Sequence, residues 1–164
     1  MEISGSCYCK RVTFSALSHT PYPYMRCYCS ICRKTAGGGG YAINIMAQAA
    51  TLKVEGAEHV GFHQARVEDE EHPGDFIISP GKRHFCLRCG SALWIFDPRW
   101  AEWIYPFASA IDTPLPTPPE IFHIMLDFAA PWVRVPQEKG HVPFPTYPKE
   151  SIVDWHQRHG LYQP

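Results

Sequence analysis

Seven cysteines lie in three short clusters, and their spacing is the pattern in this sequence best suited to chemistry. They form a C-x-C pair, a C-x-C-x-x-C triplet and a C-x-x-C pair, made in chain order of Cys7, Cys9, Cys27, Cys29, Cys32, Cys86 and Cys89. Thiolates one or two residues apart can converge on one tetrahedral Zn²⁺, whose Zn–S bonds are about 2.3 Å long. The odd total divides into four ligands for a closed structural site and three for a site with an open position.

The first and last pairs predict the closed site. Cys86 and Cys89 are followed by Gly90, which gives the C-x-x-C-G turn of a zinc knuckle, where backbone amides face the sulfur atoms. A knuckle needs two more ligands. Cys7 and Cys9 can supply them if the N-terminal strand pairs beside the strand that leads into Cys86. We therefore expect a structural zinc on these four cysteines, which would contribute to folding directly.

The triplet Cys27, Cys29 and Cys32 remains as a local cup of three thiolates. Three protein ligands plus a water or substrate are typical of a catalytic zinc, so the sequence predicts a second, catalytic and labile ion and two zinc ions per chain. Arg33 and Lys34 follow the triplet and could steer an anionic substrate to it. Two alternatives stay open: a histidine could complete an inert site, or Cys29 and Cys32 could form a redox pair, although no βαβ pattern surrounds them.

Composition excludes several other classes of function. The 164 residues are 45% hydrophobic and 19% charged, which suits a globular chain with a real core. A net charge of −1 gives no electrostatic reason to expect nucleic acid or an acidic membrane surface as partner. No apolar run approaches the roughly 20 residues of a membrane span. Without signal-peptide features the expected location is cytoplasmic, where free thiols favour metal chemistry over disulfides.

Alternating residues and frequent turns predict a mostly-β fold. Strands are expected over Lys10–Ser15, Tyr22–Arg26, Tyr41–Met46, Thr51–Glu55, His59–Gln64, Arg83–Phe85, Ala92–Phe96, Ile121–Leu126 and Trp132–Val135. Gly56 indicates a hairpin turn, and Val67–Asp75 an acidic loop. Ser151–His159 is predicted as a short C-terminal helix, with Ser151 as N-cap. We expect residues 1–140 to form the zinc-binding domain and residues 141–164 an arm and helix that pack on it.

Three linked motifs give the chain a family resemblance. They read Gly5-Ser-Cys7-Tyr-Cys9, then Cys27-Tyr-Cys29-Ser-Ile-Cys32-Arg33-Lys34, then Arg83-His-Phe85-Cys86-Leu-Arg-Cys89-Gly90-Ser91. Together they resemble the glutathione-dependent formaldehyde-activating enzyme family, which also includes centromere protein V. The resemblance implies a β-tent of antiparallel sheets pinned by a structural zinc. It also implies the division of the cysteines reached from spacing, with Cys27, Cys29 and Cys32 as the catalytic set.

The resemblance further implies a carbon–sulfur lyase that acts on a thiol adduct of a small aldehyde. The reaction that names the family condenses formaldehyde with glutathione to S-hydroxymethylglutathione, the reverse of a lyase cleavage. The implied partners are a small-molecule thiol and an aldehyde, with no nucleic acid and no membrane, and a homodimer stays open. The alternatives are a non-catalytic, zinc-stabilised binding module and the same scaffold acting on another thiol or electrophile.

Three features depart from the family pattern. Lys10 stands where the family usually has glycine after the first C-x-C, which would alter the turn at the structural site. The acidic stretch around Val67–Gly74 resembles an insertion, and the tail from His141 lies beyond the common core. We expect the insertion and the tail to reshape or cap the substrate pocket.

Overall fold

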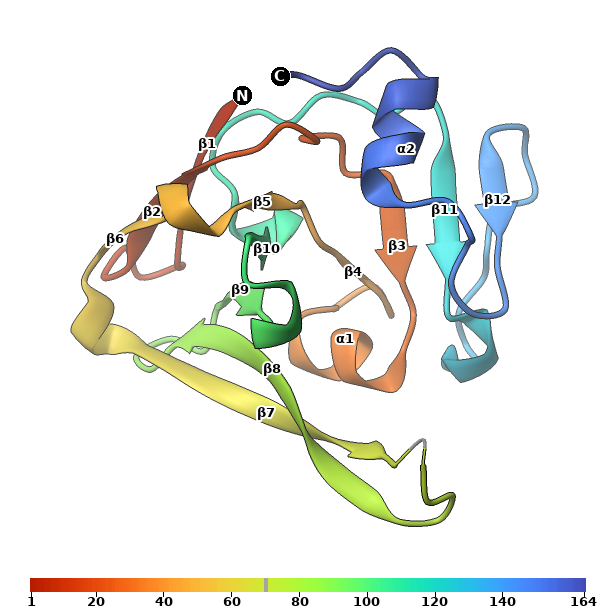
Figure 1. The fold of residues 1–164 in the computed structure, drawn as a ribbon, viewed down its shortest axis with the longest axis horizontal. Helices are drawn as coiled ribbons and strands as arrows, with labels where there is room; N and C mark the ends of the chain where they lie inside the picture. The colour runs from red at the N-terminus through yellow and green to blue at the C-terminus, as the bar shows by residue number, and fades with distance from the viewer. Residues whose placement is uncertain (70) are drawn as a thin grey trace.

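Three small β-sheets build the molecule, with one short helix in the first quarter of the chain and a second helix near the C-terminus (Figure 1). The structure is a computed structural model, and it describes residues 1–69 and 71–164. Its mostly-β character and short C-terminal helix confirm the fold class that the sequence predicts. Residue 70, within the predicted acidic loop, lies outside the described residues.

The first sheet is wholly antiparallel and contains the N-terminus. Its order is β1 (Glu2–Ser6), β2 (Thr13–Leu17) and β6 (Lys53–Glu55). Strand residues alternate between its two faces, so Ile3, Phe14 and Ala16 all lie buried on the inner side.

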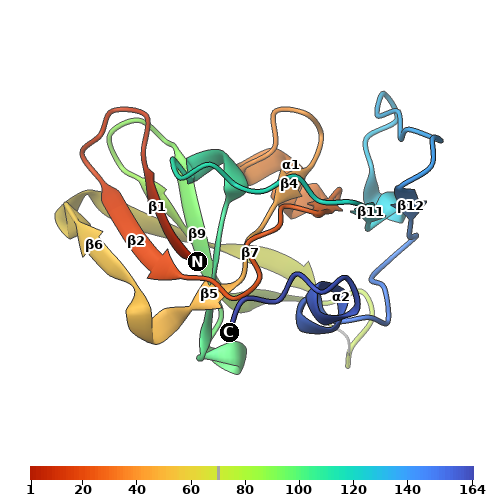
Figure 2. The ribbon, with the colours of Figure 1, turned by 90° about the horizontal axis from the view of Figure 1, so that it is seen from above.

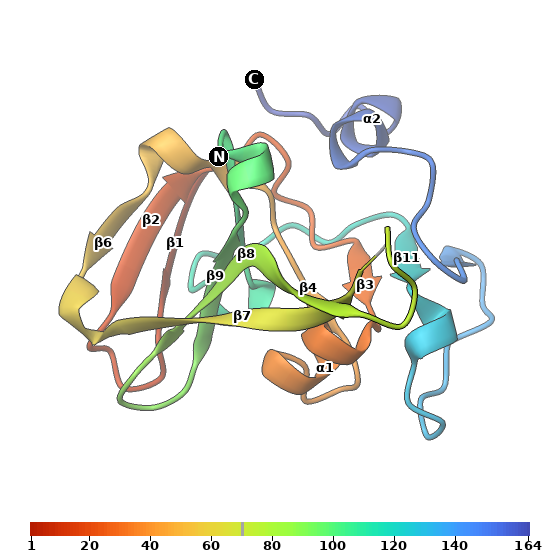
Figure 3. The same ribbon diagram turned by 60° about the horizontal axis from the view of Figure 1, so that its bottom comes forward.

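The second sheet is antiparallel as well and has five strands. Its order is β5 (Ala47–Gln48), β10 (Trp103–Pro106), β9 (Ala92–Phe96), β8 (Phe76–Cys86) and β7 (Val60–Glu68). The β7–β8 hairpin extends past β9, across the side of the molecule that holds the first helix (Figure 3).

The third sheet is mixed rather than antiparallel. Its order is β12 (His141–Pro143), β11 (Ile121–Ile124), β3 (Met25–Cys27) and β4 (Ala42–Ile43). β11 runs parallel to both β12 and β3, while β3 and β4 are antiparallel. The helix α1 (Ser30–Thr35) follows β3 directly, and α2 (Ile152–Arg158) comes near the end of the chain. Single 3-10 turns cover Ala49–Thr51, Ala57–His59, Pro98–Trp100, Ala108–Ala110 and Leu126–Phe128.

The buried side chains form two separate clusters, and each contains part of the cysteine pattern. The first cluster fills the space between the first two sheets and includes Cys7 and Cys86. The second lies between the third sheet and the C-terminal segment, and it includes Cys27 and Cys32. Figure 2 shows the two halves side by side, with β1, β2 and β6 at one end and β11 and β12 at the other.

The C-terminal helix is held against the second cluster by an aromatic stack. Trp155 is fully buried, and its ring lies 3.8 Å from that of Tyr24, nearly parallel to it. The hydroxyl of Ser151 accepts a hydrogen bond from the amide of Asp154, as the capping pattern predicts. Gly160 ends the helix with φ of 67°, a conformation that glycine adopts without strain.

Three local predictions were wrong. Gly56 does make a left-handed turn, but β6 and β7 on either side of it join different sheets instead of forming a hairpin. Trp132–Val135 forms no strand; Trp132 and Val133 pack instead over Gly40, where a Cβ atom would lie 2.7 Å from the Val133 side chain. The predicted loop is also shorter, since β7 continues to Glu68.

Within the described residues, neither helix has the length and apolar character needed to cross a lipid bilayer.

Candidate metal centres and the adjoining cavity

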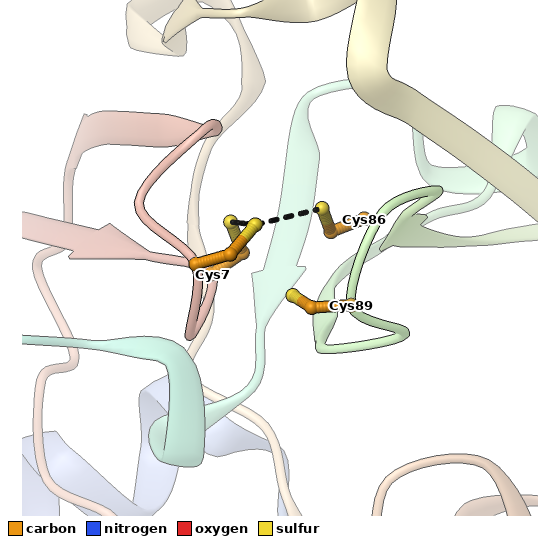
Figure 4. A group of neighbouring side chains, drawn as sticks. Cys7, Cys86 and Cys89 are labelled. Carbon is orange, nitrogen blue, oxygen red and sulfur yellow. Dashed lines mark hydrogen bonds between the residues drawn. The ribbon is translucent and has the colours of Figure 1, made fainter.

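The first and last cysteine pairs meet between two sheets. Cys7 and Cys9 lie in the turn that joins β1 to β2, while Cys86 ends β8 and Cys89 lies in the turn before β9. Figure 4 shows the labelled side chains of Cys7, Cys86 and Cys89 approaching one another from these two loops. The four sulfur atoms all lie within 4.8 Å of one another.

The spacing of the sulfur atoms fits a tetrahedral metal ion. Four sulfur atoms at Zn–S bonds of about 2.3 Å would be separated by about 3.8 Å in a regular tetrahedron. The distance is 3.5 Å from Cys7 Sγ to Cys9 Sγ and 3.9 Å from Cys9 Sγ to Cys86 Sγ. Cys7 and Cys86 are fully buried, Cys9 is partly buried and Cys89 is exposed, and together the four cysteines could hold a metal ion.

Backbone amides point at the sulfur atoms, as expected of a knuckle. The amide of Val12 donates to Cys7 Sγ over 3.3 Å, and that of Arg88 donates to Cys86 Sγ over 3.4 Å. Ser91 lies 3.2 Å from Cys89 Sγ, and this hydrogen bond, with others from the backbone, lowers the pKa of Cys89 to about 5. The hydrogen bonds to Cys7 and Cys89 favour the thiolate forms that metal binding requires.

The route by which these cysteines meet differs from the predicted one. β1 pairs only with β2 among the described strands, and it does not lie beside β8. The two pairs converge because the first sheet faces the second and both loops end at the same side. The convergence depends on the packing of two sheets.

Lys10 occupies a strained position in the first of these loops. Its φ is 59°, in the left-handed region that most residues other than glycine and asparagine avoid. The ammonium group donates to Ser6 Oγ over 2.6 Å and lies 3.3 Å from the Asp112 carboxylate. The turn is therefore the one a glycine would make, with the lysine side chain held to its neighbours.

The triplet is built by a single local segment. Cys27 ends β3, Cys29 is the N-cap of α1, and Cys32 lies in the first turn of that helix. The amide of Cys32 donates to Cys29 Sγ over 3.3 Å, which is the hydrogen bond of a helix cap made by a thiol. The three sulfur atoms lie within 4.8 Å of one another, so they could also hold a metal ion.

All three cysteines of the triplet line a cavity of about 580 Å³. Around them Met25, Ile31 and Ile124 form an apolar wall. The facing wall comes from the second sheet, where Arg83, Ile95 and Tyr105 are consecutive partners across β8, β9 and β10. Tyr147 and Ile152 of the C-terminal segment complete the enclosure, so a ligand would reach the thiols through a partly apolar space.

Charged groups gather on the sheet side of this cavity. Asp97 is 6% exposed and forms a two-pronged ion pair with Arg99, with distances of 3.0 and 2.7 Å. The hydrogen bond from this guanidinium holds the pKa of Asp97 below its usual range. Arg83 borders both this cavity and a smaller one of about 200 Å³. With Asp97 balanced by Arg99, the lining other than the thiols carries one positive charge.

Comparison of the sequence with known proteins places the chain in a family. The sequence profile of the glutathione-dependent formaldehyde-activating enzymes matches residues 2–126. The chain belongs to this family. A Halomonas elongata protein, which carries the provisional name of a glutathione-dependent formaldehyde-activating enzyme, is 55% identical over 161 residues, 98% of each chain. A crystal structure of a Rhodobacter sphaeroides protein aligns with a TM-score of 0.49 at 22% identity, covering 86% of this chain and 98% of that one.

The remaining site predictions have mixed outcomes. The seven cysteines group as the spacing predicts, into the sets that the family resemblance also implies. In the part of the chain that the structure describes, no histidine, aspartate or glutamate joins the triplet's cluster. Arg33 and Lys34, predicted to steer a substrate, are not among the residues that line the cavity.

Sequence reasoning missed most of the cavity's polar lining. The sequence analysis does not single out Asn44, Asp97, Arg99 or Tyr147, and it names Arg83 only within a predicted strand and a family motif. These residues become neighbours of the triplet through the register of the second sheet and the return of the C-terminal segment. The one local signal is the Asp97-x-Arg99 spacing, which places the two charges within reach of each other.

Proposed function

We propose that this chain is a zinc-dependent enzyme that joins a thiol to a small aldehyde, with glutathione and formaldehyde as substrates and S-hydroxymethylglutathione as product. In the classification of reactions this is a carbon–sulfur lyase running in reverse. One observation carries the proposal. Three thiols open into a cavity of about 580 Å³, while the other four cysteines meet between two packed sheets. The family's name and that of the 55% identical relative support the same chemistry.

We assign two zinc ions per chain. Cys7, Cys9, Cys86 and Cys89 would hold a structural ion, and Cys27, Cys29 and Cys32 a catalytic ion with a free coordination position. When bound at the triplet, zinc supplies a Lewis acid and a binding partner for a substrate thiolate. The reaction needs no redox partner, since the new S–C bond replaces the carbonyl π bond and the thiol proton ends on the former carbonyl oxygen.

The protein's own residues position the reaction. The helix cap at Cys29 holds that sulfur toward the cavity and stabilises its negative charge through the Cys32 amide. Met25, Ile31 and Ile124 exclude water from one side of the substrates. Holding thiol and aldehyde together at the same sulfur cluster converts a bimolecular encounter into a local one.

The C-terminal segment would then serve the same site. Tyr147 and Ile152 line the cavity, so residues 141–164 act as an arm that closes a domain of residues 1–140. A cytoplasmic location fits a substrate such as glutathione, which is abundant there. We expect small molecules and not nucleic acid as partners; the state of association stays a prediction for solution measurement.

Exchange spectroscopy tests the function directly. Formaldehyde and glutathione equilibrate slowly with their adduct, and NMR exchange rates report any acceleration. We expect zinc-loaded protein to accelerate exchange at least 100-fold over buffer, and Cys29→Ser to lose most of that gain because it removes one thiolate of the open site. The exposed variant Arg134→Gln serves as the control.

Equal exchange with wild-type protein, with Cys29→Ser and with buffer would overturn the catalytic proposal and favour the non-catalytic binding module. Acceleration for another thiol or electrophile but not for glutathione would place the scaffold on a different substrate.

A further inference from the structure

Two buried hydrogen-bond donors on the cavity lining have no partner among the described residues. They are Nε of Arg83 on β8 and Nδ2 of Asn44, just beyond β4. A buried donor without an acceptor costs about 1–3 kcal/mol, so such groups are rare unless something else meets them. Both residues line the cavity into which the three thiols open.

The positions of these two residues are fixed by the sheets. Arg83 pairs with Ile95 across β8 and β9, and Ile95 pairs with Tyr105 across β9 and β10. Asn44 forms an isolated bridge to Phe107, directly after β10. Both donors therefore stand on ordered backbone, and neither depends on a loop to reach the cavity.

The other charged groups of the cavity are already matched. Asp97 accepts hydrogen bonds from Arg99 at Nε and Nη2 and from its backbone amide. Arg83 has no carboxylate within ion-pair distance in the described part of the chain. Arg83 therefore lacks a negatively charged acceptor on this side of the cavity. A carboxylate would supply two acceptor oxygen atoms.

We propose that Arg83 and Asn44 form a carboxylate-binding subsite that selects thiols carrying an acidic group. The proposal rests on the proposed function, because it treats the triplet as the place where the thiol binds. An acidic thiol of peptide size would put its sulfur at the triplet and a carboxylate at Arg83, with Asn44 donating to the carboxylate or to a nearby amide oxygen. Thiols without a carboxylate lack this second anchor.

A competing explanation gives Arg83 a different task. Its charge could simply balance the negative charge of three thiolates, in which case it would support any thiol equally. The two explanations differ in one measurable respect, the dependence on the substrate's own carboxylates. Glutathione and glutathione diethyl ester have the same thiol and differ in those groups, so they are matched probes.

The experiment measures binding by calorimetry or by quenching of the fluorescence of Trp100, which lines the cavity. Zinc-loaded wild-type protein should bind glutathione at least tenfold more tightly than the diethyl ester. Arg83→Gln should weaken glutathione binding about tenfold to a hundredfold and change ester binding less than threefold. Asn44→Ala should weaken glutathione binding severalfold. The matched control is Arg134→Gln, which changes an exposed arginine outside the cavity that donates to the backbone carbonyls of Pro131 and Val133.

Arg83→Lys is the control for a folding defect. It keeps the charge but removes Nε, and we expect glutathione binding intermediate between wild type and Arg83→Gln, with an unchanged circular dichroism spectrum. Equal weakening of acid and ester by Arg83→Gln would overturn the subsite and leave charge balance as the role of Arg83. Unchanged glutathione affinity in both arginine variants would overturn it too.

These outcomes separate the subsite from the function. Arg83-dependent binding of glutathione with no acceleration of exchange would retain the subsite and reject the enzyme. Accelerated exchange with equal rates for acid and ester, in wild type and Arg83→Gln alike, would retain the enzyme and reject the subsite.

Discussion

The two cysteine clusters use the same ligand in opposite settings. The four-cysteine cluster lies between two sheets, with Cys7 and Cys86 fully buried in the first hydrophobic cluster. The triplet belongs to the second hydrophobic cluster, yet all three of its residues line a cavity. Four thiols complete a tetrahedral site and leave nothing for a substrate, whereas three do not. The difference supports our proposal that one cluster serves folding and the other serves chemistry.

The two clusters also differ in how far apart their cysteines lie in the sequence. Cys9 and Cys86 are 77 residues apart, so a metal ion there would close a long loop and join two sheets. The triplet spans one short segment around the start of α1, and a metal ion there closes almost no loop. Loss of the first site should therefore destabilise the whole molecule, while loss of the second should be local.

The largest effect is expected from Cys7→Ser. It removes a fully buried ligand, and structural zinc sites contribute binding energy of about 10–16 kcal/mol to folding in small domains, comparable to the whole stability of a protein. We expect the variant to unfold, seen as loss of dispersion in NMR spectra and of the cooperative urea transition. Cys32→Ser, also buried, is the matched control and should keep both. A Cys7→Ser protein with wild-type urea midpoint would show that the two clusters do not differ in this way.

A smaller and more selective effect is expected from Cys29→Ser. Serine caps a helix as well as the thiol does, so the hydrogen bond from the Cys32 amide is retained and stability should change by less than about 1 kcal/mol. The variant should contain one zinc ion per chain by mass spectrometry where wild type contains two. Cys29→Ala should lose the same ion and about 1 kcal/mol more, because it has no cap.

Retention of both ions in Cys29→Ser, or unfolding like that of Cys7→Ser, would contradict the division of roles.

The sequence predicts the features that depend on neighbouring residues. The cysteine sets follow from spacings of one or two residues, and α2 follows from Ser151 and Gly160 at its ends. The pairing of β6 and β7 with separate sheets depends on distant strands, which Gly56 does not report. The helix α1 escaped prediction because its six residues are too few for a periodic pattern and its cap is a cysteine.

The cavity could not be predicted for the same reason. Arg83 and Tyr105 face it only because β8, β9 and β10 adopt one particular register, and a shift of one residue would turn both side chains away. Tyr147 reaches it only because the chain returns after β12.

The third sheet also contains a buried histidine, His123 on β11, that should make stability depend on pH. His123 has no exposed surface, and its ring nitrogens lie 2.8 Å from the Tyr28 hydroxyl and 2.9 Å from His141 Nδ1. Burial, with the charges of Arg26 and His141, lowers the pKa of His123 to about 4. The unfolded chain binds this proton near pH 6.5, so stability is complete above that pH and falls as pH drops toward 4.

We expect this loss to be on the order of 3 kcal/mol, from about 1.4 kcal/mol per unit of pKa shift. His123→Gln should be less stable at pH 7 and should show a flatter dependence between pH 6.5 and 4 in urea unfolding. Acid also releases thiolate-bound metal, but that effect is common to both proteins and cancels in their difference. Parallel curves for the two proteins would show that His123 does not carry the pH dependence.

The smallest effect concerns the loop of the four-cysteine cluster. Lys10 has φ of 59°, which costs a residue with a Cβ atom about 1 kcal/mol relative to glycine. Its ion pair with Asp112 joins two groups that are 66% and 54% exposed, and such pairs contribute little at physiological salt. Lys10→Gly should therefore raise the free energy of unfolding by about 0.5 kcal/mol in 0.5 M salt and by less at low salt. Lys10→Ala keeps the strain and loses the ion pair, so it should be less stable than both. If Lys10→Gly is instead less stable than wild type at high salt, the hydrogen bond from Lys10 to Ser6 outweighs the backbone strain. The Lys10 side chain then helps to stabilise the loop of the four-cysteine cluster.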